Sequence, residues 1–237
     1  MKEGTMSEGG HNQFCPIAMA ADILCNRWTI MLVRELLLGT SRFNDLRRGL
    51  PKMSPALLSK RLKELEAAGV VTRRQADGTP DLFEYGLTEA GRALKPIVYA
   101  IGDWGHHWVS TEASLAKLDV KLLMWNMRRT IRTDPMPPGR SVIQIIYRDL
   151  QPPTRNWWLL VEAGKDTDLC SVDPGYDVDL YISTDLKTMT EVWMGYGTIG
   201  CAKADERLTF IGNPELEATF GTWLGSSRFA TMEKKVA

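Results

Sequence analysis

Both ends of one helix are clearly marked in the stretch SPALLSKRLKELEAAGVVTRR, residues 54–74. Ser54 is of a residue type that caps helix N-termini, and Pro55 suits the first helical position because its φ is already helical. Gly69 provides the left-handed conformation that ends many helices. Two valines, a threonine and two arginines follow. A short capped helix that leads directly into a basic strand is the strongest constraint on the fold.

This helix has an apolar face and a basic face. At about 100° per residue, Leu58, Leu62 and Leu65 fall on one stripe, which indicates the side that packs on a core. The opposite side carries Ala56, Leu57, Lys60 and Lys63, and it is therefore mostly small and cationic. Such a helix fits the major groove of DNA, where lysine donates to phosphates and a small side chain permits close approach. A solvated surface helix has the same pattern, so the neighbouring elements decide between the two interpretations.

The neighbouring elements favour groove binding. Three short helices are predicted before this one, and two strand-like runs follow it, separated by the loop QADGTPD. A longer helix then starts at Thr88 and is interrupted by Pro96. These elements are expected at residues 16–25, 27–39, 41–50, 70–74, 82–87 and 88–108. Helices followed by a two-stranded hairpin make a mostly α winged helix-turn-helix domain, a fold that docks on DNA.

The charges are unevenly distributed along a chain that is neutral overall, with 29 basic and 29 acidic residues. Residues 42–74 contain nine basic and three acidic residues, whereas residues 165–191 contain seven acidic and two basic ones. The first segment is a basic patch, and the second is expected to repel DNA. The predicted DNA contacts are Arg42, Lys52, Ser54, Pro55, Ala56, Ser59, Lys60, Arg61, Lys63, Arg73 and Arg74.

Residues 14–109 resemble the HxlR family of bacterial winged-helix regulators. The resemblance is carried by the Cys-Pro-Ile opening at Cys15, the Arg27–Trp28 pair, the Arg42–Phe43 pair and the stretch LTEAGR that begins the last helix. It implies a homodimer assembled through the first and last helices. It also implies binding to an inverted repeat in double-stranded DNA, with one recognition helix on each half-site.

Cys15 is a candidate redox residue. It lies just before a helix that begins with Pro16, where backbone amides and the helix dipole lower the pKa of a thiol. Some regulators that resemble this chain sense oxidants or electrophiles through a cysteine at the matching position. The alternative is a small buried residue at a dimer interface. The other cysteines, at positions 25, 170 and 201, show no spacing typical of zinc or of a disulfide framework.

The second half of the chain has an α+β pattern. Residues 110–118 look like a joint, which gives predicted domains at 1–112 and 113–237, and a helix capped by Ser110 or Thr111 is expected to run to about residue 132. Short strand-like runs and two helices, 185–195 and 214–225, follow. The stretches LDVKLLMWNMRR and DVDLYISTDLKTMTEVWMGYGTIGCAKADERLTFIGNPELEATFGTWL follow one pattern. Through them the chain resembles, from about Lys117, a sterol carrier protein type 2 domain. That resemblance implies a curved sheet with helices on one side and an apolar tunnel.

Aromatic residues of the second half are candidates for lining such a tunnel, because pockets for apolar ligands have aromatic and aliphatic walls. They are Trp125, Trp157, Trp158, Trp193, Phe210 and Trp223. An ordinary core is the alternative for all six. Since Trp157 and Trp158 are adjacent in one strand, they are expected to point to opposite faces of the sheet.

The sequence lacks the residues that several classes of function require. No catalytic constellation, metal motif or cofactor site is recognised, and the chain is therefore predicted not to be an enzyme. The stretch GYGTIG, residues 195–200, has the letters of a dinucleotide-binding loop, but it follows a predicted helix and opens no clear helix. His106 and His107 are interpreted as a cationic helix end. Since no membrane segment or leader is recognised, a cytoplasmic location is expected.

The combined prediction is a transcriptional regulator that binds an inverted-repeat operator as a dimer. Its DNA affinity is expected to change when a small hydrophobic or lipid-like ligand binds the second domain. The alternative is a regulator that senses oxidants or electrophiles through Cys15. In that case the second domain is a structural or dimerisation module.

Overall fold

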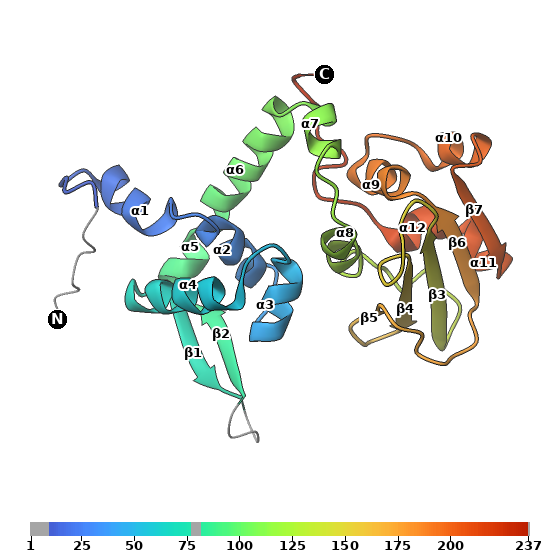
Figure 1. The fold of residues 1–237 in the computed structure, drawn as a ribbon, viewed down its shortest axis with the longest axis horizontal. Helices are drawn as coiled ribbons and strands as arrows, with labels where there is room; N and C mark the ends of the chain where they lie inside the picture. The colour runs from blue at the N-terminus through green and yellow to red at the C-terminus, as the bar shows by residue number, and fades with distance from the viewer. Residues whose placement is uncertain (1–9, 77–81, 237) are drawn as a thin grey trace. The chain divides into compact units, whose positions relative to one another are not determined.

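The computed structural model describes residues 10–76 and 82–236. The chain divides into two compact units, Met1–Gly102 and Asp103–Ala237 (Figure 1). Each unit contains its own cluster of buried apolar side chains. The predicted domain boundary between residues 112 and 113 stays a prediction. Of the loop predicted at 75–81, residues 77–81 lie outside the described residues.

The first unit is a winged helix-turn-helix. Its elements are α1 (Pro16–Leu24), α2 (Thr29–Leu37), α3 (Phe43–Gly49), α4 (Pro55–Ala67), β1 (Val71–Gln75), β2 (Phe83–Leu87) and α5 (Glu89–Ala93). The strands pair antiparallel as a hairpin, which lies beside α4 in Figure 1. The first unit ends within α6 (Lys95–Trp108). These elements confirm the predicted fold of this half.

The ends of the helices follow the predicted capping residues. The Ser54 side chain accepts a hydrogen bond from the Leu57 amide at 3.3 Å, which caps α4. Gly69, with φ of +71°, turns the chain away from the end of α4. The Thr88 side chain accepts from the Gly91 amide at 3.0 Å and so starts α5. The break between α5 and α6 comes just before Pro96, where the ladder of helical hydrogen bonds was expected to fail.

Helix α5 approaches the hairpin very closely. A Cβ atom at Gly91 would lie 2.2 Å from the carbonyl oxygen of Val70, so only glycine fits at this point. The Thr88 hydroxyl also donates to the Gly69 carbonyl at 2.7 Å. The glycine and threonine of the LTEAGR stretch therefore join the end of α4, the start of β1 and the start of α5.

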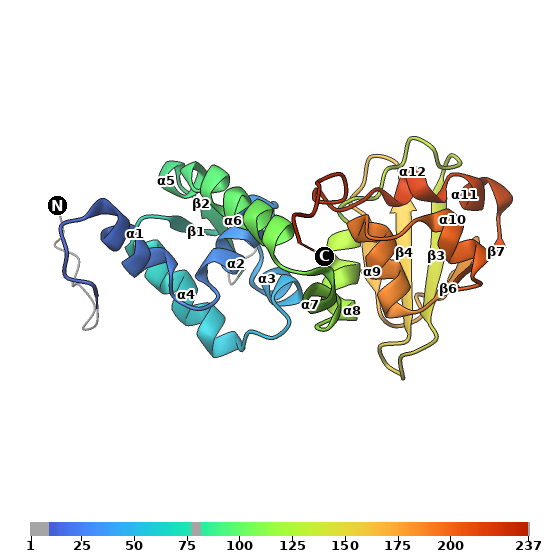
Figure 2. The ribbon, with the colours of Figure 1, turned by 90° about the horizontal axis from the view of Figure 1, so that it is seen from above.

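The second unit combines a five-stranded sheet with helices on one face. Its elements are α7 (Thr111–Leu115), α8 (Val120–Met127), β3 (Arg140–Tyr147), β4 (Asn156–Glu162), β5 (Asp168–Cys170), β6 (Leu180–Thr184), α9 (Leu186–Met194), α10 (Ile199–Ala204), β7 (Leu208–Gly212), α11 (Pro214–Ala218) and α12 (Phe220–Leu224). The strand order is β5-β4-β3-β6-β7, in which only β3 and β6 run parallel. Helices α8 to α12 contribute to one core with the inner face of the sheet, and Figure 2 shows α9 and α12 beside β3 and β4.

Three sequence predictions for the second unit were wrong in detail. The helix expected from residue 110 to about 132 is two helices, because Asp119 has an extended backbone and its carboxylate accepts from the Leu122 amide to start α8. The last predicted helix is also two, α11 and α12. The stretch GYGTIG does open a helix, since Thr198 caps α10. It still follows helix α9, so the strand that a dinucleotide-binding loop requires is missing there.

Replacing Leu62 with alanine is expected to lower the free energy of unfolding of the first unit by about 2–5 kcal/mol, because the side chain is buried and its removal leaves a cavity. Urea denaturation followed by far-ultraviolet circular dichroism measures this loss. Lys63→Ala, one position further along α4, is the matched control and should change stability by less than about 0.5 kcal/mol. Equal losses in both variants would contradict the orientation of α4.

Candidate nucleic-acid interface

Helix α4 turns its basic side away from the core of the first unit. Leu58, Leu62 and Leu65 are at most 1% exposed, whereas the side chains of Lys60 and Lys63 are exposed. Lys60 is 3.9 Å from Glu64 on the next turn, a surface pair that contributes little stability. Ala56, at the start of the helix, is also exposed, and Ser59 is half-buried. The structure therefore confirms the predicted inward and outward faces, except that Leu57, predicted on the outward side, is half-buried and packs against the core.

Arg61 differs from the other predicted contacts on this helix. Its side chain is only 13% exposed, and its guanidinium pairs with Glu64. Its Nε also donates to the backbone carbonyl of Arg27 at 3.2 Å. That carbonyl lies at the corner between α1 and α2, where Trp28 has a left-handed backbone with φ of +78°. Arg61 thus joins the basic helix to the preceding corner, which favours a positioning role, and its predicted contact with DNA stays a prediction.

The remaining predicted contacts lie on other elements of the same unit. Arg42 precedes α3 and is 3.6 Å from Glu84 of β2, while Lys52 is exposed in the turn between α3 and α4. Arg73 and Arg74 are exposed on β1, and the Arg73 guanidinium carbon lies 3.6 Å from the centroid of the Phe83 ring. This stacking holds the arginine over the wing hairpin without neutralising its charge.

A buried carboxylate between α2 and α3 was missed by sequence reasoning. Glu35 of α2 is fully buried; the Arg34 guanidinium donates to it at 2.6 Å and the Thr40 hydroxyl at 3.3 Å. A Cβ atom at Gly49 of α3 would lie 2.1 Å from its Oε2, so the carboxylate packs directly against α3. The signal was available, because Glu35 follows the buried residue Leu32 by three positions and so falls on the same side of α2.

The six aromatic residues predicted to line a tunnel mainly pack against other side chains of the second unit. Trp223 is fully buried; its indole N–H donates to the Leu216 carbonyl at 2.7 Å, and its ring meets Phe220 edge-on at 5.1 Å. The Phe210 ring also packs edge-on against Phe220, with the two ring centroids 4.9 Å apart. Trp193 is partly buried and its indole N–H donates to the Thr130 hydroxyl at 3.1 Å. These contacts belong to the core, and the ligand role of these residues stays a prediction.

The three other tryptophans are nearly inaccessible. Trp125 of α8 is 2% exposed. The guanidinium carbon of Arg128 lies 3.7 Å from the centroid of its ring. Trp157 joins the core cluster on the inner face of the sheet, and its indole N–H donates to the Thr154 carbonyl at 2.8 Å. Trp158 is also buried, and by the alternation of the strand it faces the other side.

Cys15 is half-buried at the N-cap position of α1. The backbone amides of Ala18 and Ile17, in the first turn, lower the pKa of its thiol, which increases the fraction of thiolate. None of the four cysteines, all of which lie within the described residues, forms a disulfide. In the part of the chain that the structure describes, no three His, Cys, Asp or Glu side chains are grouped as metal ligands.

No single helix within residues 10–76 and 82–236 is long and apolar enough to cross a membrane. The pair α1 and α2, bent by 82°, passes the same test by length and composition alone.

Residues 23–113 match the HxlR-like helix-turn-helix family. YvaP of Bacillus subtilis (strain 168), described as an uncharacterized HTH-type transcriptional regulator, is 43% identical over 99 residues, which are 41% of this chain and 92% of YvaP. The chain belongs to the HxlR-like helix-turn-helix family. YdeP of the same organism is 37% identical over 40% of this chain and 73% of its own length. The regulator sll1512 of Synechocystis sp. is 37% identical over 45% of this chain and 77% of its own length.

This HxlR-type protein is a DNA-binding transcriptional regulator. The family match ends at residue 113, so residues 114–237 lie outside it. The likeness to a sterol carrier domain is carried by the sequence pattern alone, and it stays a prediction.

Lys63→Ala is expected to weaken binding to a DNA duplex of mixed sequence and to reduce the slope of log affinity against log salt concentration by about one, because one phosphate contact is lost. Arg61→Ala should leave that slope unchanged, since Glu64 and the Arg27 carbonyl hold its guanidinium. Fluorescence anisotropy across a series of salt concentrations measures both slopes. The same change in the two variants would contradict the positioning role of Arg61.

Proposed function

We propose that this regulator binds an inverted-repeat operator as a homodimer, with α4 of each protomer in the major groove of one half-site. The observation that carries the proposal is the orientation of α4, which buries its leucines and presents Lys60 and Lys63 outward. The distance between two recognition helices in such a dimer sets the spacing of the half-sites.

Each proposed contact has a chemical part in this arrangement. Ser54, Pro55 and Ala56 form the start of α4, where a helix enters the groove and small side chains permit close approach. Ser59, Lys60 and Lys63 then face phosphates and base edges. The wing contributes Arg73 and Arg74, and the turn before α4 contributes Lys52. Arg42 reaches the sugar-phosphate backbone of the DNA from its position just before α3.

Selection of bound duplexes from a random pool is the test of this proposal. The protein is expected to enrich two inverted half-sites separated by one helical turn or a multiple of it, about 10 base pairs from centre to centre. Lys60→Ala/Lys63→Ala should abolish the enrichment. Enrichment of a single half-site, or of no sequence at all, would count against the dimeric operator complex.

The dimer itself is supported by apolar side chains that α1 and α6 leave exposed. On α1, Ile17 is 79% exposed, and on α6, Ile97 and Ile101 are about half exposed at a spacing that places them on one face. Exposed apolar groups that lie together mark association surfaces. Burying them against a second copy would remove this surface from water.

Ile101→Glu is expected to shift the protein from dimer to monomer, because a carboxylate within an apolar contact is costly to desolvate. Sedimentation velocity measures the change. Ile211→Glu is the matched control, since Ile211 is equally apolar, is exposed on β7 and lies far from these helices in the sequence. A dimer that survives Ile101→Glu, or that is lost with Ile211→Glu, would contradict the proposed interface.

We also propose that a small apolar ligand of the second unit modulates DNA affinity. The support is that this unit has its own core and that most of it, residues 114–237, lies outside the family match. A ligand changes DNA affinity only by the difference in its binding free energy between the free and DNA-bound states. Equal operator affinity with and without a bound ligand would rule out this regulation.

The alternative is that oxidation of Cys15 regulates DNA binding. The lowered pKa of its thiol favours this alternative. The thiolate sulfur would attack one oxygen of hydrogen peroxide, the O–O bond would break, and a sulfenate and water would form.

Cys15→Ser is expected to keep DNA binding but to lose any change in affinity caused by peroxide, measured by gel shift before and after treatment. Cys25→Ser removes an exposed cysteine at the other end of α1 and should respond as the unaltered protein does. A response that persists in Cys15→Ser would exclude Cys15 as the sensor.

A further inference from the structure

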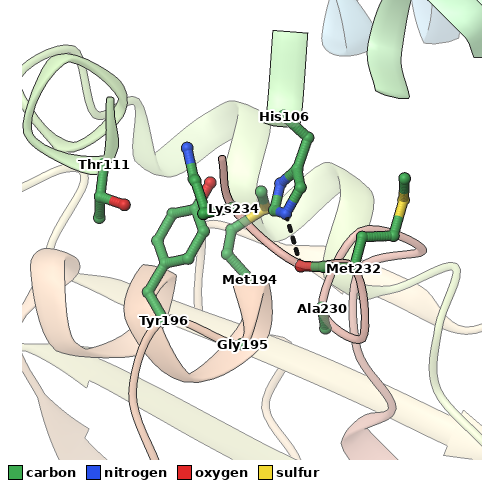
Figure 3. Close-up of a pocket in the computed structure, with 8 residues that line it drawn as sticks. All are labelled: His106, Thr111, Met194, Gly195, Tyr196, Ala230, Met232 and Lys234. Carbon is green, nitrogen blue, oxygen red and sulfur yellow. Dashed lines mark hydrogen bonds between the residues drawn. The ribbon is translucent and has the colours of Figure 1, made fainter. Parts of the chain in front are cut away.

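The second unit contains a cavity of about 280 Å³ that none of the predicted site residues lines. It is open to solvent on one side, and three separate segments line it: the region from the end of α6 to the start of α7, the turn after α9, and the C-terminal tail (Figure 3). Its walls are formed by His106, Thr111, Met194, Gly195, Tyr196, Ala230, Met232 and Lys234.

The tail is held against α6 by specific contacts, so this cavity is a built feature of the unit. Since a carbonyl only accepts, His106 donates through Nε2 to the Met232 carbonyl at 3.0 Å, and His107 donates through Nδ1 to the Glu233 carbonyl at 2.6 Å. The Lys235 amide donates to the His107 carbonyl at 2.9 Å. The two histidines therefore anchor the tail, whereas the sequence had indicated a cationic helix end.

The wall of the cavity combines flat aromatic rings and thioethers with polar groups. The rings of Tyr196 and His106 are stacked, with centroids 6.0 Å apart and planes 18° from parallel. Phe229 stacks on the same imidazole at 5.6 Å. Met194 and Met232 add thioethers, which pack well against aromatic rings. Such a wall suits a small, flat molecule with both an apolar and a polar part, and the volume of about 280 Å³ is just below the usual range of about 300–1,000 Å³ for ligand pockets.

One charge on this wall has no acidic partner among the eight lining residues. The Lys234 ammonium donates to the Val109 carbonyl at 2.6 Å and lies 5.1 Å from the centroid of the Tyr196 ring. An ammonium has three donors, so the carbonyl leaves capacity for an anion. Burial lowers the pKa of Lys234, a cost that a bound carboxylate would offset. The buried Nδ1 of His106 also has no hydrogen-bond partner within the described residues, which is uncommon.

We propose that this cavity binds a small aromatic carboxylate. The carboxylate pairs with the ammonium of Lys234, and the ring lies against Tyr196 and the two methionines. The site belongs to the second unit alone, so binding there does not depend on the operator complex. It is also distinct from the six aromatic residues that the sequence pattern had indicated.

Isothermal titration calorimetry of the full chain with three probes tests this proposal without any variant. Benzoate carries both the ring and the charge, acetate only the charge, and benzyl alcohol only the ring. Benzoate is expected to bind saturably and at least about tenfold more tightly than either of the others. Benzyl alcohol binding as tightly as benzoate would overturn the role of the charge, and acetate doing so would overturn the role of the ring. Absence of saturable benzoate binding would overturn the site itself.

Lys234→Met keeps the length of the side chain and removes its charge, and it should weaken benzoate binding at least about tenfold. Lys235→Met is the matched control, because Lys235 pairs with Glu233 at 3.2 Å and is not part of the wall. It should bind benzoate as the unaltered chain does. Unchanged binding in Lys234→Met, or equal weakening in both variants, would show that the carboxylate does not bind at this lysine.

Discussion

Burial of Leu58, Leu62 and Leu65 is the constraint on which the DNA-binding surface depends. Each buried leucine contributes about 1.5–3 kcal/mol relative to an exposed one, whereas a surface ion pair contributes about 0–1 kcal/mol. The apolar stripe therefore decides how α4 is rotated, and the Lys60–Glu64 pair does not. The cationic side of the helix points outward as a consequence, with no requirement that its lysines interact with the rest of the unit.

Helices and strands of the first unit could be predicted from the sequence because local chemistry marks their ends. The Ser54 cap, the left-handed Gly69 and the Thr88 cap each act on residues only a few positions away, so their effect can be predicted from the sequence. The inward leucine stripe was predictable for the same reason, since the helical period alone defines it. The exposed positions of Lys60 and Lys63 followed from it.

Other features depend on residues that are distant in the sequence, and these were missed. Arg61 has the same charge as Lys60, yet a carbonyl 34 positions earlier in the chain holds it. His106 and His107 donate to carbonyls 126 positions later, so the helix-end interpretation had no means of including the tail. The cavity follows from that tail contact. In the second unit, aromatic composition alone did not distinguish a ligand wall from a packed core, because both require the same side chains.

The contact between Gly91 and the carbonyl of Val70 has a mechanical consequence. Atoms of two backbones meet there, with no side chain between them that can change rotamer to absorb a displacement. A tilt of α5 must therefore be transmitted to the start of β1, and from there along the hairpin that carries Arg73 and Arg74.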